Sequence, residues 1–93
     1  MRKLYFNKKK IPSYWWDFEG DNKIIVESDN NKYPIVARFK YDPKGGRKAT
    51  KEELFVFGIS VKNLRVGAAE KAIKKAEKYI VKLVSGRIVP IAC

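Results

Sequence analysis

Basic side chains gather in two short runs of the sequence. The runs consist of Lys8, Lys9 and Lys10, and of Lys44, Arg47 and Lys48 around a pair of glycines. Positive charge on long side chains binds phosphate, and glycine lets a backbone approach a phosphate closely. The second run lacks the glycine spacing of a nucleotide-binding P-loop. Both runs predict contacts with phosphate groups, and the alternative for the second is an ordinary solvated loop.

A third basic group lies on the segment from Tyr33 to Tyr41, whose alternating pattern predicts a strand. One face would carry Ile35, Ala37 and Phe39, and the other would carry Val36, Arg38 and Lys40. If a helix covers the apolar face, Arg38 and Lys40 point to solvent, where a reader of a duplex backbone or groove would use them. The alternative is that these charges protect a sheet edge from pairing with other chains.

Aromatic residues cluster between Tyr14 and Phe18. Alternation places Trp16 on the inner face and Trp15 on the outer face. An exposed ring can stack on a base, so Trp15 is a candidate contact with a single strand. The alternative is that the whole cluster belongs to the core, because aromatic side chains dominate the cores of small domains.

Catalytic side chains are scarce. Histidine is absent and Cys93 is the lone cysteine, so serine has no histidine base and cysteine forms no metal cluster. The carboxylates that could hold Mg²⁺ for phosphodiester cleavage lie mostly in or beside predicted turns: Asp17, Glu19, Asp21, Glu27, Asp29 and Asp42. We therefore expect a protein that is not an enzyme and that uses no metal or cofactor.

The charge balance points to an acidic partner. The chain has 21 lysine and arginine residues against 10 aspartate and glutamate residues, which gives a net charge of +11. Self-repulsion of this size destabilises a compact domain. Nucleic acid, an acidic protein and an anionic membrane surface would each relieve it. Lysine-rich composition of a thermophilic or viral source is the alternative that needs no partner.

Size limits the organisation of the chain to one domain, residues 1–93, because so short a chain cannot supply two cores. The longest apolar run begins at Leu54 and is far shorter than the roughly 20 residues that span a bilayer. The N-terminal residues have no apolar stretch long enough for a secretory signal. These features predict a cytoplasmic protein that does not enter a membrane.

The predicted fold is of the α+β class, with a small antiparallel β-sheet of three to five strands backed by one long C-terminal α-helix. Turn residues such as Gly20 separate the expected strands, and those after Ser28 and Tyr41 are typical of hairpins. The expected strands are a short one within the first ten residues and those at Tyr14–Phe18, Lys23–Ser28, Tyr33–Tyr41 and Leu54–Val61. The last of these is apolar on both faces, which favours a central position.

The predicted helix runs from about Val66 to Ser85. Apolar residues recur there at spacings of three and four, and Gly86 is placed to end the helix. The segment from Arg87 to Ile91 would be an edge strand, because Pro90 cannot serve a central one. This order of strands and helix is similar to that of the arm-binding domains of phage integrases and of plant AP2 domains, and more loosely to that of single-strand-binding coactivators built from a curved sheet and one helix.

Together these features predict a nucleic-acid-binding protein, for DNA more than RNA, that grips the phosphate backbone with little sequence preference. The residues expected to make the contacts are Lys8, Lys9, Lys10, Trp15, Arg38, Lys40, Lys44, Arg47 and Lys48. The alternative function is a small protein-interaction module or inhibitor, of viral or plasmid type, that binds an acidic protein surface. Either kind of protein could form a homodimer through an exposed strand edge.

Overall fold

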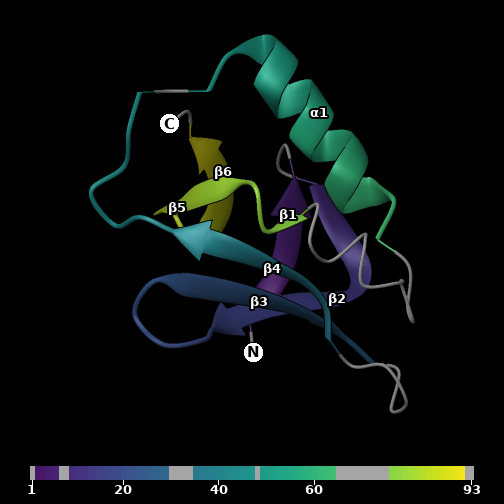
Figure 1. Cartoon of the computed structure of the whole chain (residues 1–93). Coiled ribbons are helices and arrows are strands. Elements are labelled where there is room, and N and C mark those ends of the chain that lie inside the picture. Colours follow the sequence, from purple (N-terminus) through teal and green to yellow (C-terminus); the bar gives the residue numbers. More distant parts are fainter. Residues whose placement is uncertain (1, 7–8, 30–34, 48, 65–75, 92–93) are drawn as a thin grey trace.

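The computed structural model describes residues 2–6, 9–29, 35–47, 49–64 and 76–91. In this part of the chain, six strands and one helix follow each other in the order shown in Figure 1. They are β1 (Arg2–Phe6), β2 (Lys9–Phe18), β3 (Lys23–Ser28), β4 (Ile35–Tyr41), α1 (Lys51–Lys62), β5 (Ile80–Val84) and β6 (Arg87–Ile91).

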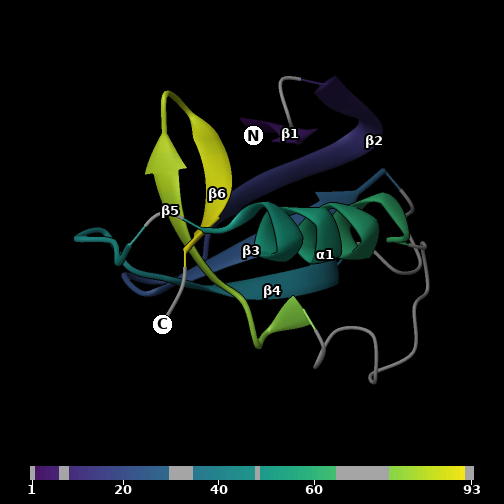
Figure 2. The ribbon, with the colours of Figure 1, turned by 90° about the horizontal axis from the view of Figure 1, so that it is seen from above.

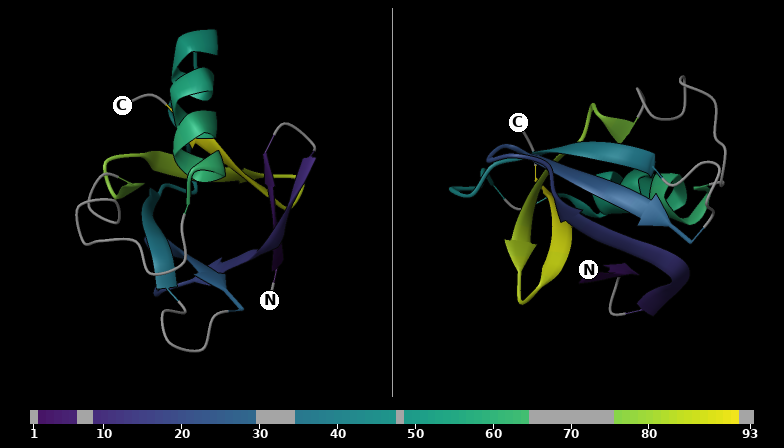
Figure 3. Two further views of the ribbon diagram at one scale, coloured as in Figure 1. Left: turned by 90° about the vertical axis from the view of Figure 1, so that its right-hand side faces the viewer. Right: turned by 90° about the horizontal axis from the view of Figure 1, so that it is seen from below.

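The six strands form one mixed sheet in which spatial order follows chain order. All neighbouring strands are antiparallel except β4 and β5, which run parallel, and α1 lies in the connection between them. The sheet curls until its two edge strands, β1 and β6, come into contact (Figure 3, left). Among the described residues no backbone ladder joins β1 to β6, so this contact is an open seam, which we call the β1–β6 seam.

Irregular pairing produces the curl. The β1–β2 register shifts between Lys3 and Tyr5, and the β3–β4 register shifts between Val26 and Glu27. Within β2, Ser13 adopts a left-handed conformation with φ of 64°. Extra residues on one strand bend it and increase its twist, which allows the sheet to close on itself.

The core fills the inside of the curl, and α1 packs against it (Figure 2). Phe57 of α1 lies at the centre of this core. The centre of its ring is 6.0 Å from that of Phe6, 5.4 Å from that of Phe39 and 5.3 Å from that of Tyr79. Gly58 lets the helix approach β1, because a Cβ at this position would collide with the Phe6 ring. The other buried apolar residues are Leu4, Trp16, Ile24, Val26, Val36, Ala37, Val61, Ala76, Val81, Ile88 and Ile91.

The expected strand at Leu54–Val61 is wrong, because this segment lies within α1. Thr50 caps the helix by accepting a hydrogen bond from the Glu53 amide, and two glutamates stand in the first turn. Every third or fourth residue from Leu54, including Phe57 and Val61, faces the core. The sequence therefore carried a helix start signal and a helical stripe that the run of β-branched and aromatic residues outweighed.

The long C-terminal helix is also wrong. Residues 80–84 form β5 and residues 87–91 form β6, while the rest of the expected helix falls largely on residues 65–75, outside the described part. Ser85 and Gly86 both have positive φ, 52° and 78°, as the tightest β-hairpin turns require. Gly86 thus makes a hairpin and does not end a helix, and over the described residues the fold is a six-stranded mixed sheet with one short helix.

Most of the other expected strands are confirmed. β3 has the predicted bounds, β2 contains the predicted aromatic strand, and β6 is an edge strand that carries Pro90. The residues after Tyr41 do not make the expected hairpin, since β4 leads to α1 and then pairs in parallel with β5. The same placement of α1 departs from the strand-then-helix order of the integrase domains. No helix in the described ranges has the length and apolar character needed to cross a bilayer.

Candidate nucleic-acid interface

Arginine side chains in the described part are mostly engaged within the protein. The ion pairs are Arg2 with Asp17 at 3.1 Å, Arg38 with Glu19 at 3.1 Å and Arg47 with Glu53 at 2.9 Å. Two of the predicted site residues, Arg38 and Arg47, are thus partly neutralised. Partly exposed pairs of this kind contribute at most about 1 kcal/mol, so a phosphate could replace either carboxylate at little cost.

The lysine side chains differ from the arginines. Among the described residues no lysine joins an ion pair, and Arg87 is the arginine without a carboxylate partner. Lysine keeps its charge on a flexible stem and binds phosphate as a point charge. The positive charge open to a ligand therefore comes from the lysines and from Arg87.

Two lysines meet on the β1–β2 hairpin. Lys10, a predicted site residue, is exposed on β2 and lies next to Lys3 of β1. Side-chain hydrogen bonding with Lys3, then charge repulsion from Lys3 and finally desolvation, lower the pKa of Lys10. Lys9 precedes Lys10 on the same strand and lies opposite Phe6. In the part of the chain that the structure describes, none of these lysines forms an ion pair, so this end of the hairpin concentrates positive charge.

A second pair of lysines meets on the β3–β4 ladder, where Lys23 stands directly opposite Lys40. Like charges at facing positions of an antiparallel pair are destabilising. Both side chains are exposed, and with Arg38, Phe39 and Glu77 they line a small hollow of about 80 Å³. The outer face of these strands therefore carries basic side chains, as the sequence predicted for Arg38 and Lys40. Val36 does not point outward as expected but is buried.

The glycine-containing loop after β4 has a defined shape. The Asp42 carboxylate accepts a hydrogen bond of 3.0 Å from the Lys44 amide, and the Asp42 carbonyl accepts one from the Gly45 amide. Gly45 has a φ of 68°, and its missing side chain leaves room for the stem of Lys82. The Lys44 side chain is exposed. This loop therefore adds an exposed lysine on an element other than the β1–β2 hairpin.

The two tryptophans face the sides of the strand that alternation predicted, but Trp15 is less exposed than expected. Trp16 is fully buried, and the Arg2 guanidinium lies 4.7 Å from the centre of its ring. Trp15 faces the outside of β2 between Lys3 and Glu27, but it is half-buried and its ring N–H has no acceptor among the described residues. Much of the Trp15 ring is therefore covered by its neighbours.

Some expected site residues fall outside the described part, namely Lys8, Lys48 and the lone Cys93. Conversely, the sequence did not single out Lys3 and Lys23, each of which lies close to another lysine. Their signal was available only through strand register, because each becomes notable when a partner strand places another lysine beside it.

Within the described ranges, no group of three or more histidine, cysteine, aspartate or glutamate side chains comes together in a way that could hold a metal ion. Asp17 and Glu19, two of the carboxylates considered for Mg²⁺, are bound to arginines. Comparison with known protein families, curated proteins and solved structures finds no match for this chain.

We expect replacement of Lys3 with methionine to raise the pKa of Lys10 towards its ordinary value of 10.5, because the two largest of the effects that lower it come from Lys3. NMR titration of the lysine side-chain resonances measures this directly. Lys62→Met, on α1, is the control and should leave the Lys10 titration unchanged. An unchanged Lys10 pKa in the Lys3 variant would show that the two ammonium groups are not neighbours in solution.

Proposed function

We propose that this protein binds nucleic acid, with DNA as its main ligand, by gripping the phosphate backbone with little sequence preference. The observation that supports this function best is the placing of lysines beside lysines, Lys3 with Lys10 and Lys23 with Lys40. A protein gains no stability from such contacts. A phosphate placed between two ammonium groups would turn their repulsion into attraction.

The rest of the charge distribution agrees with a backbone contact. Among the described residues, the cations without a carboxylate partner are the lysines and Arg87, and the net charge of +11 would draw any polyanion to the protein over a long range. Phosphate contacts of this kind position a protein on nucleic acid but carry no sequence information. The further contacts proposed from the sequence are Lys8, Lys9, Arg38, Lys44, Arg47 and Lys48, with Trp15 as a stacking partner.

The test is fluorescence anisotropy of labelled single-stranded DNA, duplex DNA and RNA of equal length, repeated over a salt series. We expect log K to fall linearly with log salt, by about 0.9 per phosphate contact on duplex and about 0.7 on single strands. Polyglutamate at equal charge concentration is the control, and it should compete poorly because it lacks phosphate. Binding weaker than about 100 µM at about 50 mM salt would overturn the proposal, since non-specific binders do better.

A protein-binding role is the second candidate, and a separate observation favours it. The outer face of α1 exposes Phe55, Val56 and Ile59, with 68%, 49% and 44% of their surfaces open. Large apolar side chains that gather on a surface often mark a contact with another protein. If polyglutamate competes as well as DNA, the lysines recognise negative charge in general, and an acidic protein partner becomes the better explanation.

A further inference from the structure

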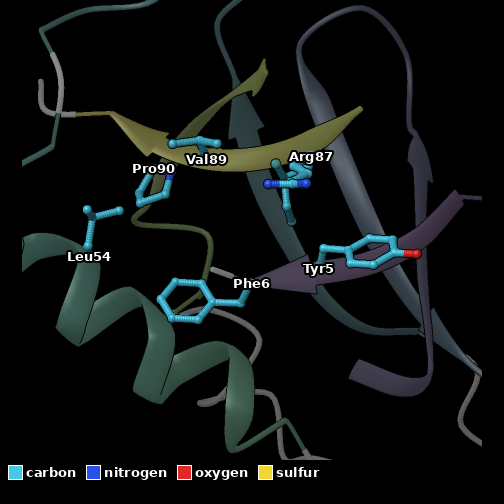
Figure 4. Close-up of a pocket in the computed structure, with 7 residues that line it drawn as sticks. Tyr5, Phe6, Leu54, Arg87, Val89 and Pro90 are labelled. Atoms are coloured by element: carbon cyan, nitrogen blue, oxygen red, sulfur yellow. The ribbon is translucent and has the colours of Figure 1, made fainter. Parts of the chain in front are cut away.

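A hollow of about 200 Å³ opens at the β1–β6 seam (Figure 4). β1 contributes Tyr5 and Phe6, and α1 contributes Leu54. The segment of β6 from Arg87 to Pro90 forms the remaining wall. In Figure 4, Tyr5 and Arg87 lie at one end of the hollow, while Leu54 and Pro90 lie at the other. The hollow is smaller than the roughly 300–1,000 Å³ of a site for a whole drug-sized molecule, so it suits a single ring.

The walls combine apolar surface with positive charge. Arg87 is the arginine that, in the described part of the chain, has no carboxylate partner. The strand register puts Lys10 directly opposite Tyr5 and Lys9 opposite Phe6. No acidic residue lines the hollow. An occupant that complements this site carries a flat apolar part and negative charge close beside it.

The Tyr5 side chain is half-buried, and its hydroxyl makes no hydrogen bond with the described residues. The Tyr5 ring is therefore positioned by β1, and part of its surface is open to a ligand. A base can stack on such a ring, and an arginine guanidinium offers a second plane for stacking. An extended peptide fits the seam less well, because Cα atoms of β1 and β6 lie within 8 Å of each other. Inserting a strand between them needs about 9–10 Å.

We propose that this hollow takes one base of a single-stranded nucleic acid, stacked on Tyr5, while Arg87 and Lys10 hold the neighbouring phosphates. The inference rests on the proposed function and adds the form of the ligand. In a duplex the bases are paired and stacked, and removing one has a free-energy cost of a few kcal/mol. Single strands present unstacked bases without that cost. The hollow therefore gives the protein a preference for single strands.

The experiment compares a labelled twelve-residue oligothymidine with an abasic oligonucleotide of the same length and charge. We expect the wild-type protein to bind oligothymidine between about fivefold and about 100-fold more tightly, the range that one stacked base gives. Tyr5→Leu should abolish this preference and leave the affinity for the abasic strand unchanged. If neither strand binds, the proposed function fails. If both bind equally to the wild-type protein, the base site alone fails.

Matched variants separate the hollow from other aromatic surfaces. Phe55→Leu removes the most exposed of the large apolar side chains in the described part, and Phe18→Leu removes a second exposed aromatic ring that does not line the hollow. Both should keep the preference for oligothymidine. Loss of the preference in either variant, with Tyr5→Leu behaving as wild type, would overturn the assignment to the hollow. Thermal unfolding of each variant shows whether it is folded.

A measurement on the unaltered protein covers the case in which Tyr5→Leu does not fold. Oligonucleotides that carry 5-bromouracil crosslink to a side chain beside the base on irradiation, and mass spectrometry locates the linked residue. We expect the crosslinked peptide to contain Tyr5 or Arg87. Crosslinks confined to Trp15 or to α1 would overturn the proposal. Competition by an acidic peptide that carries a phenylalanine, at the same concentration as oligothymidine, would assign the hollow to a protein partner instead.

Discussion

Replacing Phe57 with alanine is expected to lower the free energy of unfolding by about 3–5 kcal/mol. The Phe57 side chain is 1% exposed and contacts the rings of Phe6, Phe39 and Tyr79, so its loss leaves a cavity where β1, β4 and α1 meet. Marginally stable domains have only about 5–15 kcal/mol in total, so this variant should be partly unfolded at room temperature or close to it. Urea denaturation followed by circular dichroism measures the change.

Phe55→Ala is the matched control, because it makes the same substitution two positions earlier on α1. The Phe55 side chain is 68% exposed, and we expect its removal to change stability by no more than about 0.5 kcal/mol. Residues two apart share a face in a strand but lie on nearly opposite faces of a helix. Equal losses of stability in the two variants would contradict the helical structure of α1 and would favour the strand expected from the sequence.

Replacing Lys9 and Lys10 together with glutamine is expected to weaken binding to single-stranded DNA by more than about tenfold at about 50 mM salt. Two lost phosphate contacts should also reduce the slope of log K against log salt by about 1.4. The same anisotropy titration measures both quantities. We expect a large effect at these two positions because Lys10 and Lys9 lie opposite Tyr5 and Phe6, which line the hollow.

The control for charge is the double variant Lys51→Gln and Lys62→Gln, which removes two exposed lysines from the two ends of α1. Both double variants lose the same net charge, so long-range attraction weakens equally. We expect the control to keep the wild-type salt slope. Equal slopes for the two double variants would mean that the protein attracts nucleic acid through its total charge without a defined contact surface.

Strands with strong alternation were predictable from the sequence, and the helix was not. β3 and the aromatic part of β2 follow their patterns because their partners on both sides are strands. In α1 the run from Leu54 to Val61 is rich in residues that prefer strands, and the cap at Thr50 together with packing of Phe57 overrides that preference. β5 was missed because its apolar spacing fits a helix as well as a strand, and Gly86 serves either as a helix end or as a hairpin turn.

The sign of the charge on the candidate interface was predictable from the sequence, but the positions of its residues were only partly predictable. Composition indicates an acidic partner, and the run at Lys9 and Lys10 proved to lie on an exposed strand. Sequence distance could not show that Lys23 faces Lys40, nor that Tyr5 and Arg87 share a hollow, because residues at opposite ends of the chain meet through the closing of the sheet. Such sites depend on topology, which local patterns do not contain.

The parallel pairing of β4 with β5 has a consequence for how the molecule opens. The ladder between them comprises only Lys40 with Ile80 and Tyr41 with Val81, and the opposite side of the β5–β6 hairpin meets β1 without a ladder. The hairpin can form early from neighbouring residues, but it docks late, after the intervening chain has closed a long loop. We expect it to detach more readily than the rest of the sheet. A ligand held between Tyr5 and Arg87 would tie β6 to β1, so binding would hold the β1–β6 seam closed and slow hydrogen exchange in this hairpin.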